Sequence, residues 1–227
     1  MSAPEETAPR GRAAAGRSAR TRDAIVDLAI RLFNEGGVAK VTTNHIAAAA
    51  GISPGNLYYH FRNKEEIVRA AYGRFGEEAD ALLSVPPEGE QAPAAELLRR
   101  YPAGTFAIIS RYRFFFEDMA ELCRRDEALA DDLRRLQRRF VARLKELLLR
   151  LRGTGLVLPG TPEAELEMLA DNVWLVSRGW MEFAANAEVP EPTEQAVRRG
   201  VAHIFALVRP CLSPVGRTAL DRILAEG

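Results

Sequence analysis

The chain has 227 residues, of which 47% are hydrophobic and 27% are charged, and its formal net charge is zero. These proportions are typical of a globular protein with a buried apolar core, and they exclude a disordered or fibrous class. Charged residues interrupt every apolar stretch before it reaches the roughly 18 residues of a membrane span, so no membrane partner is expected. We expect a cytoplasmic protein, because no apolar block of a secretion signal follows the N-terminal arginines and Cys123 and Cys211 form no disulfide framework.

The charge is distributed unevenly along the chain. Residues 1–75 carry 11 Lys and Arg against 7 Asp and Glu, whereas the remaining residues carry 20 against 24. A small basic N-terminal domain attached to an acidic body is a pattern that suits nucleic-acid binding.

The first residues predict a disordered basic arm followed by a helix. Residues 1–19 are rich in Ala, Gly, Pro, Glu and Arg and almost lack large apolar side chains, so nothing there offsets the entropy of ordering. From Thr21 onward, Ile25, Leu28 and Leu32 follow helical spacing. This first helix is expected to end at the two glycines at 36 and 37.

Two short helices follow, each with a start signal. Thr42 or Thr43 caps the second helix, and Gly51 supplies the tight turn after it. Ser53 caps the third helix, and Pro54 occupies a first helical position that needs no N–H donor. The pattern predicts a helix-turn-helix at about 42–61.

A fourth helix completes the N-terminal domain, which we expect to span residues 20–80. Asn63 caps this helix, and Glu66 lies three residues later as in a capping box. The exposed face of the third helix carries polar groups that suit base edges and phosphates of DNA. By periodicity alone, these groups are equally consistent with an ordinary solvated helix face.

Residues 81–227 predict a second, larger helical domain, which begins with a Pro-rich connection at 85–93. Apolar residues recur every three or four positions over 129–151, about 163–186 and about 194–209, and no convincing strand pattern exists, so the fold is all-α. An aromatic set with isolated polar groups predicts a ligand pocket, although core packing is the more common role of such side chains. The predicted pocket residues are Phe106, Tyr112, Phe115, Met119, Trp174 and Arg178.

The run from Thr42 to Glu65, together with Phe33 and the glycines at 36 and 37, closely resembles the helix-turn-helix signature of the TetR family. The resemblance spans Arg20 to Phe75. It implies that double-stranded operator DNA is the partner. The residues implied to contact phosphates are Thr42, Thr43, Tyr58, His60 and Lys64, and those implied to face base edges are Pro54, Gly55, Asn56 and Tyr59. We place Ser53, at the start of the third helix, in the same interface.

The resemblance also implies a homodimer formed through the last two large helices and a C-terminal pocket for a small apolar or amphipathic effector. The expected function is a repressor that a ligand releases from a palindromic operator. The alternatives are an activator, a regulator without a ligand, or a helical binding module that does not bind DNA. No enzyme, cofactor or metal site is expected, because the three histidines, His45, His60 and His203, belong to no catalytic or metal-binding motif.

Overall fold

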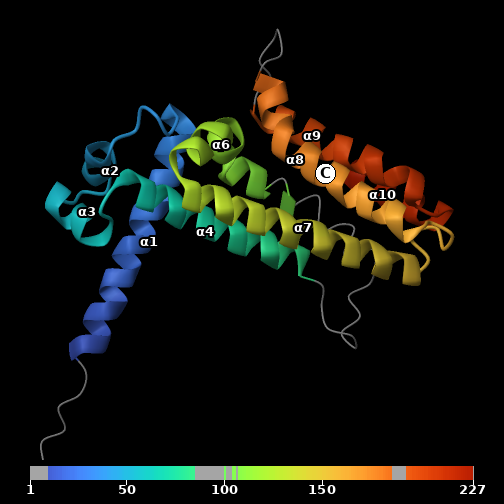
Figure 1. The fold of residues 1–227 in the computed structure, drawn as a ribbon, viewed down its shortest axis with the longest axis horizontal. Coiled ribbons are helices and arrows are strands. Elements are labelled where there is room, and N and C mark those ends of the chain that lie inside the picture. The colour runs from blue at the N-terminus through green and yellow to red at the C-terminus, as the bar shows by residue number, and fades with distance from the viewer. Residues whose placement is uncertain (1–9, 85–99, 101–103, 106, 186–192, 227) are drawn as a thin grey trace, which may run out of the picture. The chain divides into compact units, whose positions relative to one another are not determined.

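The computed structural model describes residues 10–84, 100, 104–105, 107–185 and 193–226. Within these ranges the regular elements are helices, and the only β-type pairing is an isolated bridge between Val157 and Leu212. The expected all-α fold is therefore confirmed (Figure 1). None of the described helices is long and apolar enough to cross a membrane. The expected connection at 85–93 and the pocket residue Phe106 lie outside the described residues.

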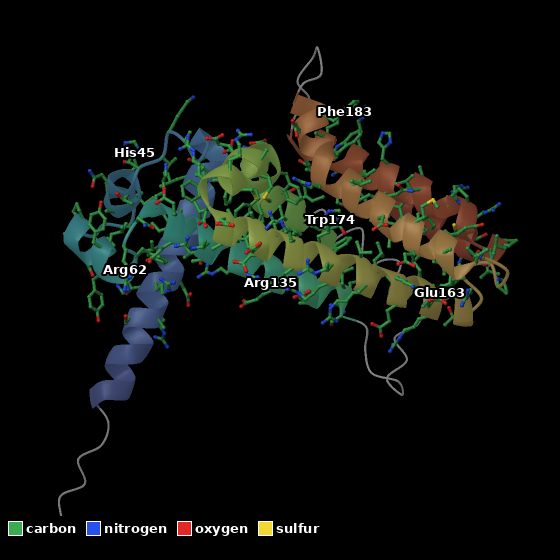
Figure 2. The ribbon with its side chains drawn as sticks, in the orientation of Figure 1. His45, Arg62, Arg135, Glu163, Trp174 and Phe183 are labelled. Carbon is green, nitrogen blue, oxygen red and sulfur yellow. The ribbon has the colours of Figure 1, made fainter. Side chains whose placement is uncertain are left out.

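The residues up to Tyr72 form one unit, which contains α1 (Arg10–Gly36), α2 (Thr43–Ala49), α3 (Pro54–His60) and the start of α4 (Lys64–Leu83). Helix α1 contacts both α2 and α3, which also contact each other. His45 lies on α2, and Arg62 lies just beyond α3 (Figure 2).

The first helix begins at Arg10, about eleven residues before the expected start. The prediction of a disordered arm is therefore wrong for residues 10–19, and residues 1–9 lie outside the described ranges. Ala and Arg have high helix propensity, and three consecutive alanines occur at 13–15. A helix that is already nucleated by packing further along the chain extends through such a segment at little cost.

The second unit begins at Gly73, so the division falls inside α4 and not near residue 80. The reason is that residues 73–83 contribute side chains to the apolar interior of the second unit. Phe75 lies against the rings of Tyr112 and Phe115, with centroid distances of 5.5 and 5.8 Å. The expected limit at residue 80 would have removed these contacts from the unit that they stabilise.

The second unit consists mainly of helices that follow α4. They are α6 (Arg113–Arg125), α7 (Glu127–Gly153), α8 (Glu163–Ala185), α9 (Thr193–Val208) and α10 (Pro214–Glu226), and a short 3₁₀ turn, η1 (Arg209–Cys211), lies between α9 and α10. The three apolar repeats found in the sequence correspond to α7, α8 and α9. Helix α8 packs against α6, α7 and α9 (Figure 1).

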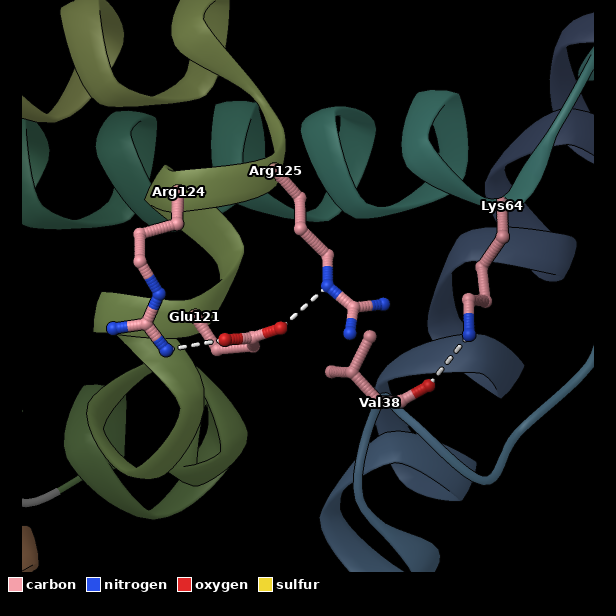
Figure 3. Close-up of polar contacts among 5 residues, drawn as sticks. All are labelled: Val38, Lys64, Glu121, Arg124 and Arg125. Carbon is pink, nitrogen blue, oxygen red and sulfur yellow. Dashed lines mark hydrogen bonds and ion pairs between the residues drawn. The ribbon is translucent and has the colours of Figure 1, made fainter.

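Local signals explain where α6 ends and α7 starts, which the apolar periodicity did not predict. Asp126 ends α6 and caps α7, since its Oδ1 accepts the N–H of Leu129 at 3.2 Å. Arg124 and Arg125, in the last turn of α6, both pair with Glu121 (Figure 3). Cations at this position also interact favourably with the C-terminal end of the helix dipole.

The start of α10 is joined to the loop that follows α7. The hydroxyl of Ser213 donates to the carbonyl of Gly155 at 2.7 Å and accepts the N–H of Gly216 at 3.1 Å. The Ser213 N–H donates to the Leu156 carbonyl at 2.9 Å. These bonds satisfy backbone groups of the buried Leu156 and of the first turn of α10, and they close one end of the second unit.

The same junction generates a stability prediction. A Cβ atom at Gly216 would lie 2.2 Å from the Leu156 carbonyl oxygen, which is backbone and cannot rotate away. We expect Gly216→Ala to lower the free energy of unfolding by about 1–3 kcal/mol, measured by urea unfolding followed by circular dichroism. The control is Gly73→Ala in α4, an exposed position with open space around its Cβ, where Ala should add about 0.5–1 kcal/mol. Equal effects of the two substitutions would contradict the steric explanation.

Candidate nucleic-acid interface

Helix α2 begins with a capping box. The N–H of His45 donates to Thr42 Oγ1 at 3.2 Å, and the N–H of Thr42 donates back to His45 Nδ1 at 3.4 Å. Thr42 is therefore the N-cap, and Thr43 is the first helical residue. After α2 the chain turns through Gly51, whose φ of 65° lies in the left-handed region that favours glycine.

Helix α3 is held at both ends. At its start, Ser53 Oγ accepts the N–H of Asn56 at 3.2 Å, and Pro54 occupies the first turn. At its end, Nη1 of Arg22 from α1 donates to the His60 carbonyl at 3.0 Å. The Arg22 guanidinium also lies 4.0 Å from the centre of the Phe61 ring, a cation–π contact. A seven-residue helix would fray in isolation, but these contacts fix its length and direction.

The angle between α2 and α3 is set by buried apolar side chains and one polar bridge. Ile46 of α2 and Leu57 of α3 are fully buried, and Phe61 is nearly so. On the outer side, Thr43 Oγ1 and the Tyr58 hydroxyl lie 3.2 Å apart, within hydrogen-bonding distance. The two helices therefore behave as one rigid piece.

The outward face of α3 is exposed and free of negative charge. Tyr59 is 78% exposed and Tyr58 is 50% exposed, while Pro54, Gly55 and Asn56 are also exposed. No Asp or Glu occurs in the sequence between Glu35 and Glu65, a stretch that contains Lys40 and Arg62. This surface presents hydroxyl, amide and imidazole groups without a carboxylate to repel phosphates.

Lys64 has a structural role that the sequence did not reveal. Its ammonium donates to the carbonyls of Val38 at 2.8 Å and Val41 at 3.1 Å, and so ties the start of α4 to the loop between α1 and α2 (Figure 3). The capping box expected at Asn63 is also displaced by one residue. Asn63 Oδ1 accepts the N–H of Glu66, but the Glu66 carboxylate accepts the N–H of Arg62.

The structure gathers the predicted DNA-binding residues on one small part of the first unit. Nine of them lie on α2, α3 or their N-caps, and Lys64 opens α4. Thr42 and Ser53 cap their helices, and Tyr58 bridges them, so these three side chains also have roles within the protein. Their contacts with DNA remain a prediction.

The second unit contains two apolar cavities that are candidates for ligand binding. Phe115, Met119, Trp174 and Arg178 line the first, which has about 650 Å³ of empty space, part of it open to the solvent. The second has about 700 Å³ by the same measure and is lined mainly by Leu, Val and Ile. The predicted pocket set therefore lies largely along one cavity.

Tyr112 does not line this cavity, contrary to the prediction. Its ring is fully buried, and its hydroxyl donates to Glu78 Oε1 at 2.8 Å. Burial, followed by the bond to the Glu78 carboxylate, raises the pKa of Tyr112 well above its usual value, so the hydroxyl stays protonated and remains a donor. Glu78 also pairs with Arg111 at 3.1 Å. The Tyr112 hydroxyl is thus occupied by its hydrogen bond to Glu78 inside the second unit.

Sequence reasoning missed two polar residues at the cavities, Thr105 and Ser177, both of which line the first and the second cavity. Ser177 lies three residues after Trp174 and directly before Arg178, so a helical wheel places all three on adjacent parts of α8. This spacing in the sequence could have indicated that Ser177 lies beside the predicted pocket residues Trp174 and Arg178.

Comparisons with known proteins agree with this architecture. Residues 25–71 match the family profile described as "Bacterial regulatory proteins, tetR family", and residues 74–220 match the TetR profile described as "Bacterial transcriptional repressor". The crystal structure of a TetR-family transcriptional regulator from Marinobacter aquaeolei VT8 is 34% identical, with a TM-score of 0.77 over 91% of this chain and 96% of that one.

Two further proteins show the range of the similarity. The regulator TtgR of Pseudomonas putida is 34% identical over 80 residues, which span 35% of this chain and 38% of TtgR. The SmeT–triclosan complex shares the fold at 22% identity, with a TM-score of 0.58 over 86% of this chain and 93% of that one, and SmeT is described as a repressor from Stenotrophomonas maltophilia. The profile matches extend over both units, and the chain belongs to the TetR family of bacterial transcriptional regulators.

Proposed function

We propose that this protein is a dimeric repressor that binds a palindromic operator in the cytoplasm and leaves it when a small molecule occupies the second unit. The observation that carries the proposal is the exposed, carboxylate-free face of α3, held rigid by Ser53 at one end and Arg22 at the other. A short helix of this kind fits the major groove, where its side chains reach base edges.

The chemistry of that face suggests separate roles for its residues. The Asn56 amide can form a bidentate contact with adenine, and Gly55 allows the backbone to approach the bases closely. Tyr59 is the most exposed aromatic residue of α3. Thr42 and Thr43, at the start of α2, are suited to phosphate contacts that fix the register of the protein on DNA.

An exposed apolar stripe on α8 supports a second copy of the chain as partner. Met168, Leu175 and Phe183 are 63%, 62% and 67% exposed, and their spacing of seven and eight residues places them on one side of the helix. Gly179 lies on the same side, with open space around its Cβ position. Such a stripe is self-complementary about a two-fold axis, which is also the symmetry of a palindromic operator.

The cavities of the second unit support regulation by a ligand. Phe75, Ala79 and Leu82 of α4 line the first cavity, so a bound molecule would contact the helix that begins with Lys64. A ligand lowers operator affinity only by the difference in its own affinity for the free and the DNA-bound conformations. The SmeT–triclosan complex is a precedent for a small molecule bound within this fold.

The DNA-binding role predicts the effect of a single truncation. Tyr59→Ala should weaken operator binding about tenfold or more and leave thermal stability unchanged, because the ring is mostly exposed and its one ring contact among the described residues is with His60, at 5.1 Å. The operator would first be selected from random and genomic DNA, and affinity would then be measured by fluorescence anisotropy at several salt concentrations. Affinity of the wild-type protein should fall steeply with salt, since phosphate contacts release counterions.

Val215→Ala is the control, because Val215 is 68% exposed but lies on α10. It should bind the operator as the wild type does. Failure of the wild-type protein to enrich any sequence at low salt would contradict the proposed function and favour a helical module that does not bind DNA.

The dimer predicts a second effect. Leu175→Glu introduces a charge at the centre of the stripe and should convert the protein to monomers in sedimentation experiments, because two carboxylates would be buried without partners. Operator affinity should fall at least about a hundredfold, since each monomer contacts one half-site. Leu224→Glu, at a 46% exposed position on α10, is the control and should remain dimeric. A Leu175→Glu protein that remained a dimer would show that α8 is not the interface.

A further inference from the structure

The two cavities of the second unit adjoin each other. They share four lining residues, Leu82, Thr105, Phe140 and Ser177. The first cavity is bounded by a mixture of aromatic and aliphatic side chains, including Phe115 and Trp174, whereas the second is bounded largely by aliphatic side chains such as Leu147 and Ile204. Because the shared residues border both, the two cavities lie next to each other in the interior of the second unit.

One charged residue borders these cavities among the described lining residues. Arg178 lines the first cavity, and no carboxylate of a described residue lines either one. The guanidinium of Arg178 has no hydrogen-bond or ion-pair partner within the described part of the chain. By contrast, Arg111 and Arg113 pair with Glu78 and Glu117, each at 3.1 Å. Arg178 is therefore an exposed cation, without a partner among the described residues, at the edge of the first apolar cavity.

Ser177 adds an unsatisfied polar atom at the junction of the cavities. Its Oγ is buried and has no hydrogen-bond partner among the residues that the structure describes, although a helical serine can bond to a carbonyl of the preceding turn. Buried hydroxyls without partners are uncommon in folded proteins. Ser177 and Arg178 are consecutive on α8, and both line the first cavity.

We propose that the joined cavities bind an elongated apolar molecule with one anionic head group, of the class of medium- to long-chain carboxylates. The carboxylate accepts hydrogen bonds from Arg178 and Ser177, and the chain runs past Phe140 into the aliphatic cavity. An acid satisfies both unpartnered groups, whereas a neutral chain leaves Arg178 unpaired and a cationic one is repelled by it. This inference rests on the proposed function in one respect, because it names the chemical class of the effector to which the proposed repressor responds.

The experiment measures direct binding to the full-length protein without DNA. Saturated linear carboxylates from octanoate to hexadecanoate are titrated below their micelle concentrations, alongside primary alcohols and alkyltrimethylammonium ions of equal length. Isothermal calorimetry gives the affinity, and the fluorescence of Trp174, which lines the first cavity, gives an independent signal. We expect affinity to rise about two- to fourfold per methylene up to a limiting length. The carboxylate should bind at least about tenfold more tightly than the matching alcohol.

Three variants localise the two ends of the ligand. Arg178→Gln should abolish the preference for the acid over the alcohol, and Arg138→Gln, at an exposed α7 position away from both cavities, should preserve it. Ile204→Phe reduces the volume of the aliphatic cavity and should shorten the limiting chain length without changing the preference for the acid.

Equal affinity for acids and alcohols would overturn the inference, as would an unchanged preference in Arg178→Gln. Operator binding is then measured with and without the best carboxylate. Tight, Arg178-dependent binding that leaves operator affinity unchanged supports the ligand class and counts only against ligand-controlled release. Absence of carboxylate binding in a protein that still binds its operator counts only against the ligand class.

Discussion

The apolar packing of α2 against α3, with Ile46 and Leu57 both buried, is the interaction on which the first unit depends. Both side chains are fully buried, and together with Phe61 they determine how two seven-residue helices cross. Helices this short gain little from their own hydrogen bonds, so their order comes from packing and from the caps at Thr42 and Ser53. The polar groups of α3 can be presented in a fixed arrangement because the opposite side of the helix is locked in this way.

Much of the first unit could be predicted from the sequence because its signals are local. A cap, a proline at the first helical position and a glycine in a tight turn each act within a few residues, and the structure places Ser53, Pro54 and Gly51 in those roles. Lys64 could not be assigned in this way, because its partners Val38 and Val41 are more than twenty residues away. The early start of α1 was missed for a different reason, since low hydrophobicity predicted disorder where alanine and arginine favour a helix.

The second unit shows a different limit of sequence analysis. Periodicity indicates that a side chain faces inward, but not whether the space opposite it is filled. Tyr112 and Phe115 have the same inward pattern, yet Tyr112 is sealed by Glu78 and Phe115 borders a cavity. Protein interiors are normally close-packed, and an unfilled apolar space lowers stability in proportion to its volume. The hydrogen bonds of Ser213 and the packing of Leu156 and Leu212 at the other end of the unit help to offset that loss.

The early start of α1 changes what its arginines can do. In a flexible tail, each charge samples a large volume and loses that freedom when it meets a phosphate. In a helix that begins at Arg10, the backbone that carries Arg12, Arg17 and Arg20 is a rod that rises about 1.5 Å per residue and continues into Arg22, which already holds the end of α3. The backbone of that segment loses its conformational entropy when the protein folds. Binding an anion there therefore costs less additional entropy than binding it with a flexible tail. The geometry limits this advantage, because a straight helix contacts only a partner that lies along its axis, whereas a flexible tail can follow a curved surface.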